Sequence, residues 1–88
     1  MNQNNLNHKK FLELLRNGDT AEINNFVSSC IEAGLSPHYI YIDIIFPSLV
    51  EIGELWSQGE MSIAEEHVCT EITKSAMSVI SQKVKHKN

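Results

Sequence analysis

The sequence has few of the residues that mark secreted, membrane-spanning or disulfide-rich proteins. Only 2 of its 88 residues are cysteine, and Cys30 and Cys69 lack the spacing of metal ligands or of a disulfide framework. No apolar run approaches the ~20 residues of a membrane span. The polar start, residues 1–7, lacks the apolar core of a signal peptide. We therefore expect buried free thiols in a cytoplasmic protein that has no membrane partner.

Basic residues are also scarce. The chain has 7 Lys and Arg against 11 Asp and Glu, a net charge of −4, whereas phosphate binding needs clustered positive charge. One basic cluster occurs at the C-terminus, formed by Lys83, Lys85, His86 and Lys87. Cations are favoured at the C-terminal end of a helix, so we interpret this cluster as a helix end and expect no direct nucleic-acid contact.

The sequence lacks the common catalytic motifs. It contains no nucleophile elbow, phosphate-binding glycine loop, Cys-x-x-Cys pair or His-Glu-x-x-His helix. The 4 histidines are scattered: His8, His38, His67 and His86. We expect no catalytic residues, no protein-only metal site and no enzymatic activity of the chain by itself.

What the sequence does contain is a series of helical segments separated by short turn signals. The first is expected over residues 5–17 and ends at Gly18. The second begins at Asp19, with Glu22 completing a start that resembles a capping box, and ends at Gly34. Its apolar residues have the spacing of one buried stripe: Ile23, Phe26, Val27, Cys30 and Ile31.

A third helix is expected to open at Ser36 and Pro37. Serine caps free amides, and proline at the first helical position loses no hydrogen bond. The helix should run to about Trp56, and Pro47, where a backbone donor is missing, should either kink it or divide it into two shorter helices; we favour the kink. Its expected stripe comprises Ile42, Ile45, Phe46, Leu49, Ile52, Gly53 and Trp56.

The fourth helix is expected to follow closely. Gly59 ends the third helix, and Ser62 with Glu65 forms a capping box for a helix that runs from Ile63 into the last lysines. Its expected apolar face comprises Ile63, His67, Val68, Ile72, Ala76, Val79 and Ile80. Short connections make consecutive helices antiparallel, so residues 1–88 are predicted to form a single all-α domain, a four-helix bundle.

One stretch combines a large aromatic residue with two polar residues across a helix turn. Trp56 lies at the end of one expected helix, and Glu66 and His67 lie at the start of the next, so all three should meet at one end of the bundle. Glu66 and His67 are adjacent and point about 100° apart. Each residue also has a structural interpretation: a core tryptophan, a partner of the helix dipole and a core histidine.

Together these residues resemble the helical cap domain that precedes the Rossmann-type cobalamin domain in methionine synthases, corrinoid proteins and cobalamin-dependent photoreceptor repressors. The resemblance covers residues 45–72 in detail. The shared features are Pro47, the run Ile52-Gly53-Glu54-Leu55-Trp56, Gly59 and the start Ser62-Ile63-Ala64-Glu65-Glu66-His67.

The resemblance implies a cofactor and a site. In the family the cap lies over the upper face of the corrin ring and shields the upper axial ligand, methyl or 5′-deoxyadenosyl. Trp56 would pack over that ligand. Glu66 and His67 would lie around it and, in the photoreceptor branch, contact the adenosyl group. An apolar lid that excludes water, with polar partners at its rim, suits this chemistry.

The sequence departs from the family in one respect. The Rossmann-type domain that follows the cap carries an Asp-x-His-x-x-Gly motif, which is absent here. We therefore expect methylcobalamin or adenosylcobalamin to bind together with a Rossmann-type domain or corrinoid protein on another chain, unless this is an excised domain. Methyl transfer and light or cofactor sensing both remain open.

Two other functions also remain open. The chain could be an interaction or dimerisation module that has lost cobalamin, with an exposed end of Leu55, Trp56 and Met61 covered by a partner or a second copy. It could also bind a tetrapyrrole such as haem, with His67 as the axial ligand.

Overall fold

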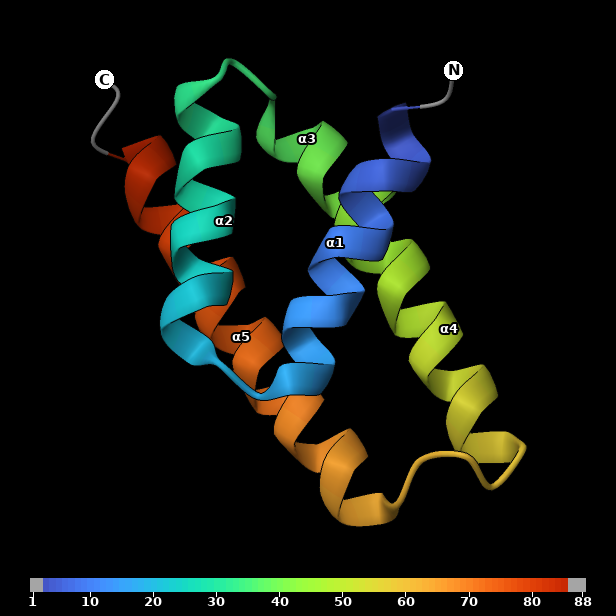
Figure 1. Ribbon diagram of the computed structural model, residues 1–88. Coiled ribbons are helices and arrows are strands. Elements are labelled where there is room, and N and C mark those ends of the chain that lie inside the picture. Colours follow the sequence, from blue (N-terminus) through green and yellow to red (C-terminus); the bar gives the residue numbers. More distant parts are fainter. Residues whose placement is uncertain (1–2, 86–88) are drawn as a thin grey trace.

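The computed structural model describes residues 3–85 and contains only helices over that range (Figure 1). In chain order they are α1 (Gln3–Asn17), α2 (Thr20–Glu32), α3 (Pro37–Tyr39), the π-helix η1 (Ile40–Ile45), α4 (Phe46–Ser57) and α5 (Ile63–Lys85). Because α3, η1 and α4 follow one another without a break, the chain has four helical segments, which alternate in direction along the chain (Figure 1). The predicted all-α four-helix bundle is confirmed. Two members of the predicted basic cluster, His86 and Lys87, lie outside the described residues.

The helix starts follow the capping signals of the sequence. The side chain of Asp19 accepts the backbone N–H of Glu22 at 3.1 Å, and the hydroxyl of Ser36 accepts the N–H of Tyr39 at 3.1 Å. Pro37 occupies the first turn of α3, where its missing donor costs no helical bond. Local side-chain chemistry therefore sets where α2 and α3 begin.

The third segment passes through Pro47 by way of a π-helix. Over Ile40–Ile45 the turns are wider, and the N–H of Phe46 bonds to the carbonyl of Tyr41, five residues earlier. The Ser48 hydroxyl donates to the carbonyl of Ile44 at 2.8 Å. The helix thus changes its hydrogen-bond pattern immediately before the proline.

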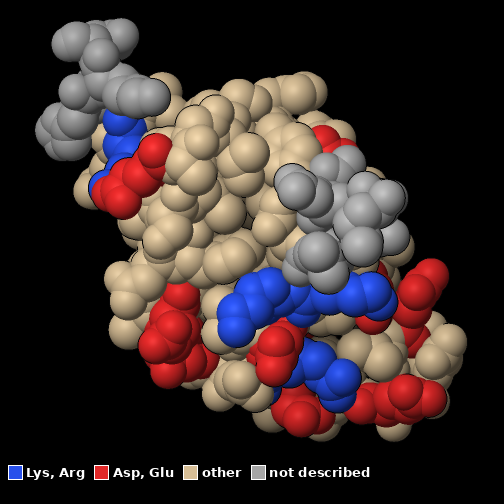
Figure 2. All heavy atoms as spheres, turned by 45° about the horizontal axis from the view of Figure 1, so that its top comes forward, with Lys and Arg blue, Asp and Glu red and all other residues tan. Residues whose placement is uncertain are grey.

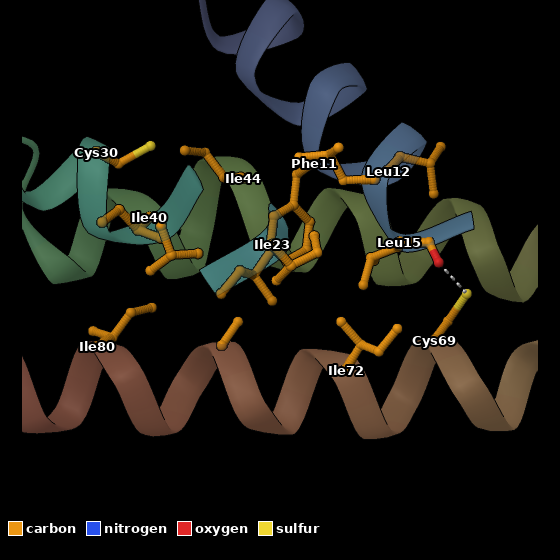
Figure 3. Close-up of a cluster of buried hydrophobic side chains, with 14 of the residues drawn as sticks. Phe11, Leu12, Leu15, Ile23, Cys30, Ile40, Ile44, Cys69, Ile72 and Ile80 are labelled. Atoms are coloured by element: carbon orange, nitrogen blue, oxygen red, sulfur yellow. Dashed lines mark hydrogen bonds between the residues drawn. The ribbon is translucent and has the colours of Figure 1, made fainter. Parts of the chain in front are cut away.

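The core lies where α1, α2, η1 and α5 meet. Figure 3 shows side chains of α5 pointing into a cluster supplied by the other helices. Fully buried members include Phe11, Leu15, Ile23, Val27, Ile40 and Ile44. Of all pairs of helices, α2 and α5 make the most extensive contact. The predicted stripe of α2 is confirmed, since all its members are buried except Phe26, which is partly buried against the core. Cys30 and Cys69 are buried free thiols, also as predicted.

The predicted stripe of the third segment is correct at only two of its seven positions. Ile45 and Ile52 are buried, but Phe46 and Trp56 are 60% and 51% exposed. Ile42 and Leu49 are also exposed. The buried side runs instead through Ile44, Ser48 and Ile52, because this is the side that α1 covers: the Ser48 hydroxyl lies 3.4 Å from the carbonyl of His8. The apolar arc of α4 is therefore wider than the surface that α1 can cover.

The predicted apolar face of α5 is wrong at its N-terminal end. Ile72, Ala76 and Ile80 are buried, whereas Ile63, His67 and Val68 are exposed and Cys69 joins the core in their place. The first turns of α5 extend beyond the end of α1 and the start of α2, so few side chains are available to cover them (Figure 1). Met61, expected at an exposed end, is also buried.

Two isoleucines on α5 test this assignment. We expect Ile72→Ala, at a site that is 5% exposed, to lower the free energy of unfolding by about 2–5 kcal/mol, since it leaves a cavity in the core. The matched change Ile63→Ala, at a site that is 71% exposed, should change it by less than about 0.5 kcal/mol. Urea unfolding followed by circular dichroism measures both, and equal losses would contradict the assigned face.

Candidate functional site

A groove of about 530 Å³ runs between α4 and α5. Its α4 wall is formed by Leu49, Ile52, Gly53 and Trp56, and its α5 wall by Glu66, Thr70, Thr73, Lys74 and Met77. The spacings on both walls are those of one helix face. The groove is the place where the sequence-predicted residues Trp56 and Glu66 come together.

The α4 wall is apolar and open. Leu49 and Trp56 are both partly exposed although they are large and apolar. A Cβ atom added at Gly53 would meet no atom within 4 Å, so the glycine leaves space in the groove. An open apolar wall of this kind is typical of a small-molecule pocket.

The α5 wall is polar, and most of its groups already have partners. The Thr70 hydroxyl donates to Oε2 of Glu66 at 3.0 Å, and the Thr73 hydroxyl donates to the carbonyl of Cys69 at 2.8 Å. Lys74 Nζ lies 3.1 Å from Oε2 of Glu71. Glu66 forms no ion pair with any residue that the structure describes. Its second carboxylate oxygen is therefore a charged acceptor that this wall can offer to a ligand.

Two well-formed helix ends hold Trp56 and Glu66 in position. At the end of α4, Gly59 has a positive φ of 75°, its N–H bonds to the carbonyl of Trp56 at 3.1 Å, and the N–H of Glu60 bonds to that of Leu55 at 2.8 Å. These two bonds define a Schellman motif, in which a left-handed glycine satisfies the last carbonyls of the helix. The carbonyls of Trp56 and of Leu55 before it are thus both held by backbone hydrogen bonds from the turn.

The start of α5 is fixed by a complete capping box, as predicted. The N–H of Ser62 donates to Oε1 of Glu65 at 2.9 Å, and the N–H of Glu65 donates to the Ser62 hydroxyl at 3.1 Å. The backbone N–H of Ser62 that bonds to the carboxylate, and after it the nearby Ser62 hydroxyl, lower the pKa of the Glu65 carboxyl. Glu66, one residue further on, is positioned by this box.

The third predicted site residue, His67, does not line the groove. Its side chain is exposed on the neighbouring face of α5, one helical step from Glu66. The structure therefore brings together two of the three predicted residues and places the third at the outer edge.

Sequence reasoning missed several residues that line the groove. Leu49 was assigned to a buried stripe, and Thr70, Lys74 and Met77 received no role. Steps of four or seven from Glu66 along α5, and the same steps backward from Trp56 along α4, identify residues on the groove side. The helical spacing was therefore visible in the sequence. Only the structure, in which α4 and α5 lie apart, shows that this side of each helix is open to solvent.

Two other hollows lie elsewhere on the described part of the chain. One, of about 210 Å³, lies between α1 and the start of α5 and includes Cys69, whose thiol is 3.7 Å from the carbonyl of Leu15. Burial raises the pKa of that thiol, which favours its unreactive form. The other is a polar hollow around Lys9 and Arg16. Neither combines an exposed aromatic surface with a carboxylate that lacks an ion-pair partner.

The described residues contain no cluster of three or more His, Cys, Asp or Glu that could hold a metal ion. Within the same part of the chain, no helix is long and apolar enough to cross a membrane.

The fold and the site define a small helical bundle with an open groove that is apolar on one wall and polar on the other. Among known families, the family model described as a B12 binding domain matches residues 8–81. The chain belongs to this family, as its helical cap domain, and the resemblance noted in the sequence is confirmed. No curated protein and no solved structure matches the chain.

The capping box that positions Glu66 should make stability depend on pH. Because the folded-state pKa of Glu65 lies below its ordinary value of 4.5, its contribution is fully present above pH 4.5 and is lost as the pH falls through the folded-state pKa. We expect Glu65→Ala to destabilise the protein at pH 7 and to approach wild-type stability in acid. Unfolding curves at a series of pH values measure this, with Glu60→Ala as a control. A difference that stays constant into acid would contradict the role of the carboxylate.

Proposed function

We propose that this chain covers the upper axial face of a corrinoid cofactor and is not an enzyme by itself. Membership of the B12-binding cap family supplies the class of ligand. The observation that carries the proposal is the groove, in which the half-exposed ring of Trp56 lies across from the carboxylate of Glu66. An apolar surface facing a polar edge suits an axial ligand that must be kept from water.

Each wall of the groove has a separate role in this proposal. Trp56 and Leu49 pack over the upper ligand and exclude water from it. The uncommitted oxygen of Glu66 accepts a hydrogen bond from a donor group on the ligand, such as a ribose hydroxyl or an amide N–H. Cobalamin itself supplies the cobalt–carbon bond chemistry. The chain thus binds and shields, and the reactive chemistry belongs to the cofactor and its partner.

His67 is assigned to the rim of the same site. It follows Glu66 directly and is exposed at the edge of the groove wall, so its imidazole can reach the outer part of a ligand that projects beyond the groove. A haem site with His67 as axial ligand has no support in the geometry, because His67 does not line the groove.

The proposed site needs a second domain. The groove is lined by α4 and α5 alone, so it would cover one face of a corrin ring. A Rossmann-type cobalamin domain, with which caps of this family usually pair, would cover the lower face. Such an assembly could serve methyl transfer or the sensing of light or cofactor.

A spectral titration tests this function. Methylcobalamin and adenosylcobalamin are added to the protein alone and to the protein with a Rossmann-type cobalamin domain, and the absorption spectrum is followed. We expect the absorption spectrum of the cobalamin to change saturably as the protein is titrated, either with the protein alone or more strongly when both proteins are present. The absence of any change in both conditions, with helicity intact, would contradict the proposal.

Substituting the tryptophan should weaken binding without unfolding the bundle. Trp56 is half exposed, so Trp56→Ala should leave helicity unchanged, while the loss of its contact weakens cobalamin binding by about tenfold. His67→Ala should have a smaller effect, in keeping with a place at the rim. Val84→Ala, an exposed apolar position near the other end of α5, is the matched control. Equal affinity for wild type and Trp56→Ala would mean that the site is misassigned.

A substitution at Gly53 should change the stability of the protein and its affinity for cobalamin in opposite directions. Leucine at this position meets no steric obstacle and favours the helix, so Gly53→Leu should raise the free energy of unfolding by about 0.5–1 kcal/mol. The same side chain would occupy the groove and weaken cobalamin binding by about tenfold or more. Chemical unfolding and the spectral titration measure the two effects. A stabilised variant that binds cobalamin as well as wild type would show that cobalamin does not bind in the groove.

A further inference from the structure

The charges of this chain are strongly segregated along the sequence. All 7 Lys and Arg residues lie outside residues 17–73, whereas all but one of the 11 Asp and Glu residues lie inside that segment. The segment includes the whole of α4, the α4–α5 turn and the first turns of α5. On the face shown in Figure 2, charged side chains gather over part of the surface and leave a broad area uncharged. Seven of the nine residues that line the groove come from this acidic segment, and Lys74 and Met77 come from the chain that follows it.

The local balance at the groove has the same sign. The basic side chain that lines it, Lys74, is paired with Glu71, so their charges largely offset each other. The carboxylate of Glu66 has a hydrogen bond from Thr70 and, within the described residues, no basic partner. One negative charge thus remains uncompensated on the groove wall.

The turn next to the groove carries acidic residues and no basic ones. Glu54 and Glu60 are exposed there, and neither forms an ion pair among the residues described, but neither lines the groove. The charge on the groove wall is therefore that of Glu66, which lies beside apolar side chains and acts on a bound ligand through less screening than in bulk water.

We propose that this groove discriminates among corrinoids by charge, favouring neutral or cationic forms and opposing negative charge on the upper face. The inference rests on the proposed function, since it takes the groove to face that side of the ring. A unit charge about 8 Å from Glu66, at an effective dielectric constant between those of a protein surface and water, shifts the affinity by roughly three- to tenfold.

The test uses two corrinoids of nearly the same shape. One is cyanocobalamin, and the other is its derivative in which one upper-face acetamide is hydrolysed to a carboxylate. Their affinities are compared by spectral titration of the protein with a Rossmann-type cobalamin domain. We expect the carboxylate derivative to bind about three- to tenfold more weakly, and the difference to shrink at high salt.

Two variants assign the effect to the groove. Glu66→Gln keeps the shape and a polar contact to Thr70 but removes the charge, and should bring the ratio of the two affinities close to one. Glu32→Gln removes one charge at the far end of α2 and should leave the ratio unchanged. Equal affinities in the wild type, or equal effects of the two variants, would overturn the inference while leaving the proposed function standing. Failure of the protein to bind either corrinoid would overturn both.

Discussion

Helix α1 keeps α4 and α5 apart, and the site depends on this separation. It packs against α4, η1 and α5, whereas α4 and α5 have little direct contact with each other beyond their shared turn. The buried side of α4 is therefore the side that faces α1, where the hydroxyl of Ser48 is completely enclosed. The opposite flank keeps its large apolar side chains but has no helix against it. A bundle in which α4 closed on α5 would have a better filled core and no groove.

The turn between α4 and α5 fixes the positions of the residues that line this end of the groove. A Schellman motif at Gly59 and a capping box at Ser62 and Glu65 end one helix and begin the next within a few residues. Trp56 and Glu66 are both close to these fixed ends, so their backbones are held even though their side chains are partly open to solvent. Rigid support under exposed side chains is what a preorganised binding site requires.

The sequence predicted most of the fold because its signals are local. Asp19, Ser36 and Ser62 cap their helices as expected, since a cap depends only on the few residues that follow it. The stripe of α2 was also predictable, because α2 is covered along its whole length. The outer positions were not: Phe46 and Ile63 have the spacing of core residues, yet no helix covers them. Periodicity shows that a face is apolar, and only the arrangement of the other helices shows whether it is buried. For the same reason the sequence could not show that Trp56 and Glu66 line one groove while His67 lies outside its lining.

The central claim is that the groove between α4 and α5 receives the cofactor, and the single tryptophan of the chain allows it to be tested directly. Nuclear magnetic resonance of the ¹⁵N-labelled protein during addition of adenosylcobalamin, with a Rossmann-type cobalamin domain present, resolves the indole N–H of Trp56 as one signal. The account predicts a large shift of that signal, together with shifts of the amides of Gly53 and Thr70, while the signals of Leu15 and Val68 beside the smaller hollow stay in place. Shifts confined to Leu15 and Val68, or a bound cofactor that leaves the Trp56 indole signal unmoved, would contradict it.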